Sequence, residues 1–174
     1  MTTSSINLAQ FLNQQYLCES LTVREVQTLL NYTELVTYQQ GEVIAEIGDV
    51  GEALYFVVSG EAALLAEREN REVEVGRMVE GELMGEMSFF DRKPRMARMV
   101  TISKQAELLK LSHRRYQRLR IEQPYIAVNL LEHAIISLDH LVRRVTMDGA
   151  SFNDYMAQEA SMESGPEEEK ELSA

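Results

Sequence analysis

Short apolar segments separated by glycines fill the middle of this chain, from Leu35 to Leu111. Most of them alternate apolar and polar residues, which is the period of a β-strand and not of a helix. They recur at spacings of about ten residues, a pattern typical of a small barrel or jelly roll. The charged run at 67–72 is predicted to be an exposed hairpin turn. The segments are LVTYQ, EVIAEI, ALYFVV, AALLAE, VEVGRM, ARMVTI and AELLKL.

Helical periodicity is concentrated at the two ends of the chain. Apolar residues at helical spacing fill 6–17, and Thr22 and Glu25 form a capping box that opens a second helix. The segment HRRYQRLRIEQ predicts a short helix, which Pro124 breaks; the longer helix that follows ends near Gly149. We therefore expect an N-terminal helical segment at 1–34, a β-barrel at 35–111, a hinge helix and a long lid or dimer helix at 112–149, and an acidic, disordered tail at 150–174.

The composition limits the class of protein. A chain of 174 residues suits one domain, and a formal net charge of −11 argues against a general nucleic-acid surface. The single cysteine, Cys18, excludes an internal disulfide and fits a reducing compartment; we expect it to be a packing residue. The N-terminus MTTSSINLAQ lacks the pattern of a secretion signal, and no apolar run approaches the roughly 20 residues of a membrane span. We predict a cytoplasmic protein with no membrane contact.

The stretch GELMGEMSFFDRKPRMA, residues 81–97, combines groups suited to a sugar phosphate. Gly85 lets the backbone approach a ligand closely, and a helical turn at MSFFD would direct N–H groups towards an anion beside it. Arg95, expected at the start of the next strand, can hold a phosphate with two parallel hydrogen bonds, and Glu86 can accept hydrogen bonds from hydroxyls. From these residues alone, a simple Glu86–Arg95 salt bridge over a β-turn is the favoured interpretation, and a ligand site is the alternative.

A wider comparison of motifs favours the ligand site. The run GEMSFFDRKPRMARMV resembles the phosphate-binding cassette of cyclic nucleotide-binding domains. In that cassette a Gly-Glu step is followed by an apolar residue and a small one, and a short helix and loop lead to an arginine. The upstream run YQQGEVIAEIGDVGEALYFVVSGEAAL resembles the opening strands of the same family, and the resemblance covers about residues 10–145. It implies a jelly-roll β-barrel of the catabolite-activator and protein-kinase-A-regulatory type, with N-terminal helices, a hinge helix and a long C-terminal helix.

The resemblance also implies roles for individual residues. Glu86 would bind the ribose 2′-hydroxyl, and Arg95 would bind the exocyclic phosphate oxygens. Ala97 would be a small residue packed near the ligand. The backbone N–H groups that would line the phosphate and ribose are those of Gly85, Met87 and Ser88.

Three positions depart from the family's pattern. Met96 stands where members that prefer guanine often carry threonine, so we expect cAMP to be favoured over cGMP. Arg98 occupies a slot that is usually small or hydroxylic; strand alternation directs it outward, together with Met96. Leu141 and Val142 fall near the places where catabolite-activator-type members hydrogen-bond the base, which neither side chain can do.

The long helix carries a heptad seam with a second apolar stripe beside it, formed by Ala127, Ala134 and Leu141. The seam allows two arrangements. It would pack wholly against the barrel, as in monomeric family members, or it would pair with its copy in a parallel dimer, as in the transcription-factor members. We favour a homodimer through Val128–Val145. The seam residues are Val128, Leu131, Ile135, Leu138, Val142 and Val145.

The histidines give no support for an enzyme or a metal site. His133 and His140 lie seven residues apart, opposite the seam, and are expected on a solvated face. None of the three histidines lies in the strand segments, which argues against a cupin-type metalloenzyme. Neither a Ser-His-Asp nor a Cys-His ordering is present.

The expected function is therefore that of a stand-alone sensor of a cyclic nucleotide. The short acidic stretch after Gly149 leaves no room for a helix-turn-helix, so we expect no nucleic-acid partner and a signal carried by a protein partner or by self-association. Ligand binding would move the long helix through a hinge at Ser112–Pro124. The alternative is a degenerate barrel that binds no ligand and serves as a protein-interaction scaffold.

Overall fold

The computed structural model of the chain describes residues 8, 20–68 and 71–147, with side chains as far as Leu138. It divides into two compact units, residues 1–135 and 136–174, which are considered separately. Apart from Leu8, which packs against the core, the helix predicted at 6–17 lies outside the described residues, as do Cys18 and the tail.

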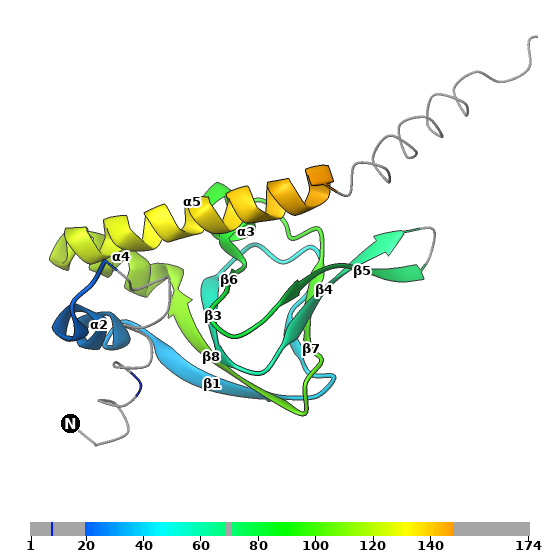
Figure 1. Cartoon of the computed structure of the whole chain (residues 1–174), viewed down its shortest axis with the longest axis horizontal. Helices are drawn as coiled ribbons and strands as arrows, with labels where there is room; N and C mark the ends of the chain where they lie inside the picture. Colours follow the sequence, from blue (N-terminus) through cyan, green and yellow to red (C-terminus); the bar gives the residue numbers. More distant parts are fainter. Residues whose placement is uncertain (1–7, 9–19, 69–70, 148–174) are drawn as a thin grey trace, which may run out of the picture. The chain divides into compact units, whose positions relative to one another are not determined.

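Eight strands in the described residues form two four-stranded antiparallel sheets (Figure 1). One sheet has the order β1-β8-β3-β6 and the other the order β2-β7-β4-β5. The predicted mainly β fold, a jelly-roll β-barrel with flanking helices, is confirmed. The strands are β1 Glu34–Gln39, β2 Val43–Ala45, β3 Ala53–Ser59, β4 Ala62–Arg68, β5 Arg71–Met78, β6 Leu83–Met84, β7 Arg98–Thr101 and β8 Gln105–Ser112.

All seven predicted segments contain a strand, and the structure adds β6. This strand is only two residues long, too short to show a period, and it pairs with Tyr55 and Phe56 of β3. The hairpin predicted at 67–72 joins β4 to β5, but its turn is tighter than expected, because Glu67 and Glu72 are already paired in the ladder.

Two apolar clusters hold the barrel and its helices together, and β3 contributes to both. Its alternate residues Ala53, Tyr55 and Val57 face the barrel interior, where they meet residues of both sheets. The intervening residues pack on the other side, against the helices. A strand buried on both faces explains why ALYFVVS reads as a continuous apolar run.

Helices cover the outer face of the sheet that contains β1 and β8 (Figure 1). Thr22 caps the first of them with the predicted capping box, and Ser112 caps the helix that follows β8. Pro124 begins the longest helix, as predicted. The helices are α2 Val23–Leu30, α3 Glu86–Asp91, α4 His113–Glu122 and α5 Pro124–Met147.

The face of α5 that meets the core differs from the predicted one. Ala127, Leu130 and Ala134 are buried in the helix-side cluster, whereas Val128 and Ile135 of the seam are exposed. In the part of α5 whose side chains are described, the seam is therefore not packed wholly against the barrel. The prediction that His133 lies on a solvated face is wrong, since it is only 8% exposed. A heptad count gives the spacing of apolar residues but not which stripe the barrel will cover.

Candidate functional site

The site is built around the turn from β6 into α3. Gly85 lies at this turn with φ +88°, in the left-handed region that favours glycine. This backbone conformation ends β6 and starts α3 at Glu86. The helical turn predicted at MSFFD is confirmed, beginning one residue earlier. The Glu86 side chain is buried although it carries a carboxylate.

Arg95 lies in the loop between α3 and β7, and not at the start of a strand as predicted, because β7 begins only at Arg98. Both backbone groups of Arg95 are held by the loop between β2 and β3. Its N–H donates to the carbonyl of Asp49 at 2.9 Å, and its carbonyl accepts from the N–H of Gly48 at 2.9 Å. A β-bridge between Val50 and Pro94 fixes the same pair of segments.

The guanidinium of Arg95 is directed into the protein, and the residue is 8% exposed. Nη2 donates to the carbonyl of Ala53 at 3.4 Å, and Nη1 contacts the sulfur of Met99 at 3.3 Å. The contact to Ala53 is long and the sulfur of Met99 is a weak acceptor, whereas a guanidinium has five N–H donors to satisfy. Burial lowers the pKa of Arg95, while the nearby Tyr55, Asp49 and Glu86 act in the opposite direction.

The charge of Arg95 is not met by a direct ion pair. None of the ion pairs recorded between described residues includes Arg95, so the simple Glu86–Arg95 salt bridge is not formed. Tyr55 cannot replace a carboxylate, because a phenol is neutral at physiological pH and burial raises its pKa further, to about 12. A buried guanidinium that makes no ion pair with a described residue is suited to bind an anion.

Two hydrogen bonds anchor α3 to the loop before β3. The Ser88 hydroxyl accepts from the N–H of Gly51 at 2.7 Å and donates to the carbonyl of Lys93. Arg92 donates from Nη1 to the carbonyl of Gly51 at 2.6 Å. A Cβ at Gly51 would lie 2.5 Å from the backbone nitrogen of Phe89, so the loop packs directly on the helix.

The structure brings together some of the predicted site residues and leaves others exposed. Gly85, Glu86, Ser88 and Arg95 belong to the partly or fully buried group around the β6–α3 turn. Ala97 is partly buried. The two exposed members are Met87 and Met96, the latter 84% exposed.

The prediction that Arg98 points outward is confirmed. Its Nε lies 2.8 Å from Glu46, and Nη1 pairs with Glu72, both on the solvent side of the barrel. Leu141, Val142 and His140 lie outside the residues whose side chains are described. No group of three metal-ligating side chains occurs in the described residues. Nor does that part of the chain contain a helix long and apolar enough to cross a membrane.

The sequence profile of the family described as "Cyclic nucleotide-binding domain" matches residues 35–122, which include the whole β6–α3–Arg95 region. The chain belongs to this family. A cyclic AMP receptor protein from Thermus thermophilus is 36% identical over 115 residues, and a cAMP-dependent protein kinase regulatory subunit from Mucor circinelloides is 31% identical over 90 residues. These alignments cover 66% and 52% of this chain, but only 53% and 21% of the two relatives.

A solved relative supports the same conclusion. The crystal structure of the Thermus thermophilus catabolite activator protein matches with a TM-score of 0.65 and 34% identity, covering 78% of this chain and 63% of that one. The chain thus spans 53% and 63% of the length of the two Thermus thermophilus chains that it matches.

Sequence reasoning missed the groups that position the cassette of this cyclic nucleotide-binding domain. Gly51 and Arg92 were not singled out, and Ser88 was considered only for its backbone N–H. The second glycine of GDVG was an available signal for close packing. Nothing in the sequence indicated that a serine hydroxyl would bridge two loops, because both of its partners are backbone groups.

The cassette helix of this domain is also in direct contact with α4. The rings of Phe89 and Phe90 meet Tyr116 edge to face, at centroid distances of 5.3 and 5.7 Å, and Phe89 also meets His113 at 5.2 Å. Phe89 and Tyr116 are buried in the helix-side cluster. The contact between α3 and α4 is therefore made directly by packed rings.

Proposed function

We propose that this domain is a cyclic-nucleotide sensor. The observation that carries the proposal is the buried Arg95 guanidinium, which makes no ion pair with any residue that the structure describes and lies against Gly85 at the start of α3. The exocyclic phosphate of a cyclic nucleotide would supply the missing anion, held by Arg95 and by the N–H groups of Gly85, Met87 and Ser88. Glu86 would accept a hydrogen bond from the ribose 2′-hydroxyl.

We further propose that cAMP is favoured over cGMP. The residue after the arginine, Met96, has no hydroxyl for a guanine base and is exposed. Ala97 would leave room for the ligand beside Arg95.

Signalling would proceed by a population shift. Phosphate binding at Arg95 would draw in the N-terminus of α3, and the packed rings of Phe89, Phe90 and Tyr116 would pass that movement to α4. Because α4 and α5 are separated only by Gln123, a shift of α4 would be transmitted to the long helix. Any partner that prefers the ligand-bound form would tighten nucleotide binding by the same factor.

The output would be a protein partner or self-association through α5. The exposure of Val128 and Ile135 supports a homodimer, because these seam residues are left uncovered while the neighbouring stripe packs on the core. Replacing Ile135 by glutamate should convert such a dimer to a monomer in sedimentation equilibrium. A wild-type protein that sediments as a monomer with and without cAMP would point to a different protein as the partner.

Thermal melting with and without nucleotide tests the binding proposal. At a cAMP concentration of about 100 times Kd, stabilisation of about 2.7 kcal/mol should raise Tm by several degrees. Arg95→Ala should abolish this rise. Arg98→Ala, which removes an outward arginine three positions away, should retain it relative to its own baseline. The absence of a shift with either cAMP or cGMP would contradict the proposal and favour a ligand-free scaffold.

A further inference from the structure

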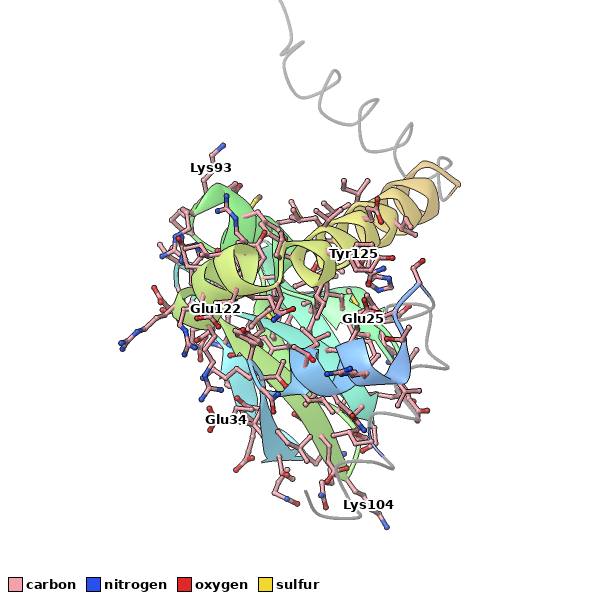
Figure 2. All side chains as sticks on the ribbon, turned by 90° about the vertical axis from the view of Figure 1, so that its left-hand side faces the viewer. Glu25, Glu34, Lys93, Lys104, Glu122 and Tyr125 are labelled. Carbon is pink, nitrogen blue, oxygen red and sulfur yellow. The ribbon has the colours of Figure 1, made fainter. Side chains whose placement is uncertain are left out.

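Helix α4 is strongly basic in an acidic protein. Its ten residues contain four arginines and one glutamate, a formal charge of +3, whereas the whole chain carries −11. Figure 2 views the end of the molecule where α4 meets α5, with Glu122 and Tyr125 labelled at that corner. Positive charge concentrated on one helix of an acidic protein creates a local field of the opposite sign to its surroundings.

The outward face of α4 combines this charge with an exposed apolar side chain. Tyr116 and Leu119 are buried on the inner side of the helix. The opposite side presents four residues at i, i+3, i+4 and i+7 spacing, and the last of them is 82% exposed. We call this set the α4 outer face: Arg114, Gln117, Arg118 and Ile121.

Part of the charge on α4 is not neutralised within the described residues. Arg118 pairs with Glu122, and Arg115 approaches Glu34 only to 4.0 Å. The ion pairs recorded for the described part of the chain include neither Arg114 nor Arg120. Arg120 lies over the ring of Tyr116 at 5.9 Å, a cation–π contact that brings no carboxylate to the guanidinium.

We propose that the α4 outer face is a docking surface for an acidic helical segment of a partner protein that carries an apolar side chain. One carboxylate would meet Arg114, a second one helical turn away would share Arg118 with Glu122, and the apolar side chain would cover Ile121. Charge complementarity would select the partner, and burial of Ile121 would add affinity. Nucleic acid fits less well, because its affinity depends on many phosphate contacts, and a protruding isoleucine contributes nothing to them.

The position of this surface links it to the cassette. Tyr116, on the inner side of the same helix, contacts Phe89 and Phe90 of α3. A partner bound to α4 would therefore favour one position of α3. This second part, that nucleotide and partner affect each other's affinity, rests on the proposed function, whereas docking itself does not.

Fluorescence anisotropy with a synthetic peptide tests the docking surface. The probe is a labelled helical peptide with glutamates one turn apart around a leucine, titrated with the full chain at low and at physiological salt. The double variant R114E/R118E should weaken binding by about tenfold or more, and Ile121→Ser should weaken it severalfold. Lys104→Glu is the matched control, because Lys104 is exposed in the β7–β8 turn at another edge of the barrel (Figure 2) and should leave binding unchanged.

Three results would overturn the proposal. Equal binding of a peptide with lysines in place of the glutamates would remove the electrostatic basis. A duplex oligonucleotide that competes at lower concentration than the peptide would indicate nucleic acid instead. Self-association that Ile121→Ser abolishes would indicate a second copy of this chain as the occupant. Thermal melting of the wild type with cAMP keeps the two proposals separate, because a missing nucleotide response there would contradict the proposed function and leave docking intact.

Discussion

A side-chain carbon at Gly85 would lie 3.1 Å from Nη1 and 3.3 Å from Nη2 of Arg95. The glycine therefore does more than permit a left-handed turn, because the absence of a Cβ lets the guanidinium lie close to its backbone without a tight contact. The position of the Arg95 guanidinium therefore depends directly on the backbone of the β6–α3 turn.

Gly85→Ala should separate these two roles of the glycine. Alanine at φ +88° is strained by about 1–2 kcal/mol, and its methyl group would also displace Arg95. Gly41→Ala is the control, since Gly41 has a similar φ of +81° and no atom within 4 Å of its added Cβ. Both variants should lose similar stability in urea unfolding, but only Gly85→Ala should weaken cAMP binding, by about tenfold or more. Similar cAMP affinities for the two variants would contradict this reading.

Gly51→Ala should damage the anchoring of α3. Its Cβ would lie 2.5 Å from the backbone nitrogen of Phe89, and backbone cannot move aside as a side-chain end can. We expect a loss of about 1–3 kcal/mol in the free energy of unfolding, measured by urea denaturation. Gly76→Ala is the matched control, because its Cβ would meet only the flexible end of Leu64 at 3.2 Å. An equal loss in both variants would show that close packing on α3 is not the cause.

The hydrogen bond from Tyr32 to Glu122 should make stability depend on pH. It lowers the pKa of Glu122 below its usual 4.5, so the carboxylate's contribution is complete above 4.5 and is lost as pH falls through the lowered pKa. The same bond raises the pKa of Tyr32 above its usual 10. The phenol's contribution to stability is therefore complete below pH 10 and is lost as pH rises through the raised pKa. The Tm difference between wild type and Tyr32→Phe should be largest near neutral pH and shrink at both extremes.

A neutral acceptor provides the control for this pH effect. The Tyr125 hydroxyl donates to the carbonyl of Ser20, which does not titrate. The Tm difference between wild type and Tyr125→Phe should therefore stay constant through the acid range. A Tyr32→Phe difference that is equally flat there would mean that Glu122 is not the group involved.

The ring contact between Phe90 and Tyr116 should affect signalling more than binding. Phe90 is partly exposed and contacts Tyr116 edge to face, so Phe90→Leu should keep the fold and remove a contact of about 0.5–1.5 kcal/mol. We expect near-normal cAMP affinity but a smaller cAMP-dependent change in hydrogen exchange along α4. Met87→Leu, at an exposed position of the same helix, should behave as wild type. An unchanged exchange response in Phe90→Leu would exclude this ring as a route of coupling.

How much of the fold could be predicted depended on how local each signal was. The capping box at Thr22, the break at Pro124 and the strand period are set by neighbouring residues, and the structure contains all three. The burial of His133 depends on which face of α5 the barrel covers. Apolar residues occupy several stripes of that helix, so spacing alone could not decide between them.

The candidate site shows the same division between local and long-range information. Gly85, Glu86 and Arg95 were recognisable because their spacing forms a motif. The loop that holds Arg95 comes from Gly48 and Asp49, more than forty residues earlier, and no period or motif in the sequence joins the two segments. For the same reason Arg95 was predicted at a strand start, whereas its hydrogen bonds are to a loop.

Isothermal titration of the wild-type protein and Arg95→Ala with cAMP tests most directly whether the buried cation is a nucleotide-phosphate site. We expect micromolar or tighter binding to the wild type, an affinity at least about thirtyfold weaker in Arg95→Ala, and an affinity within about threefold of wild type in Arg98→Ala. Binding to Arg95→Ala within a few-fold of wild type, or no heat from the wild type with either cAMP or cGMP, would contradict the proposed site.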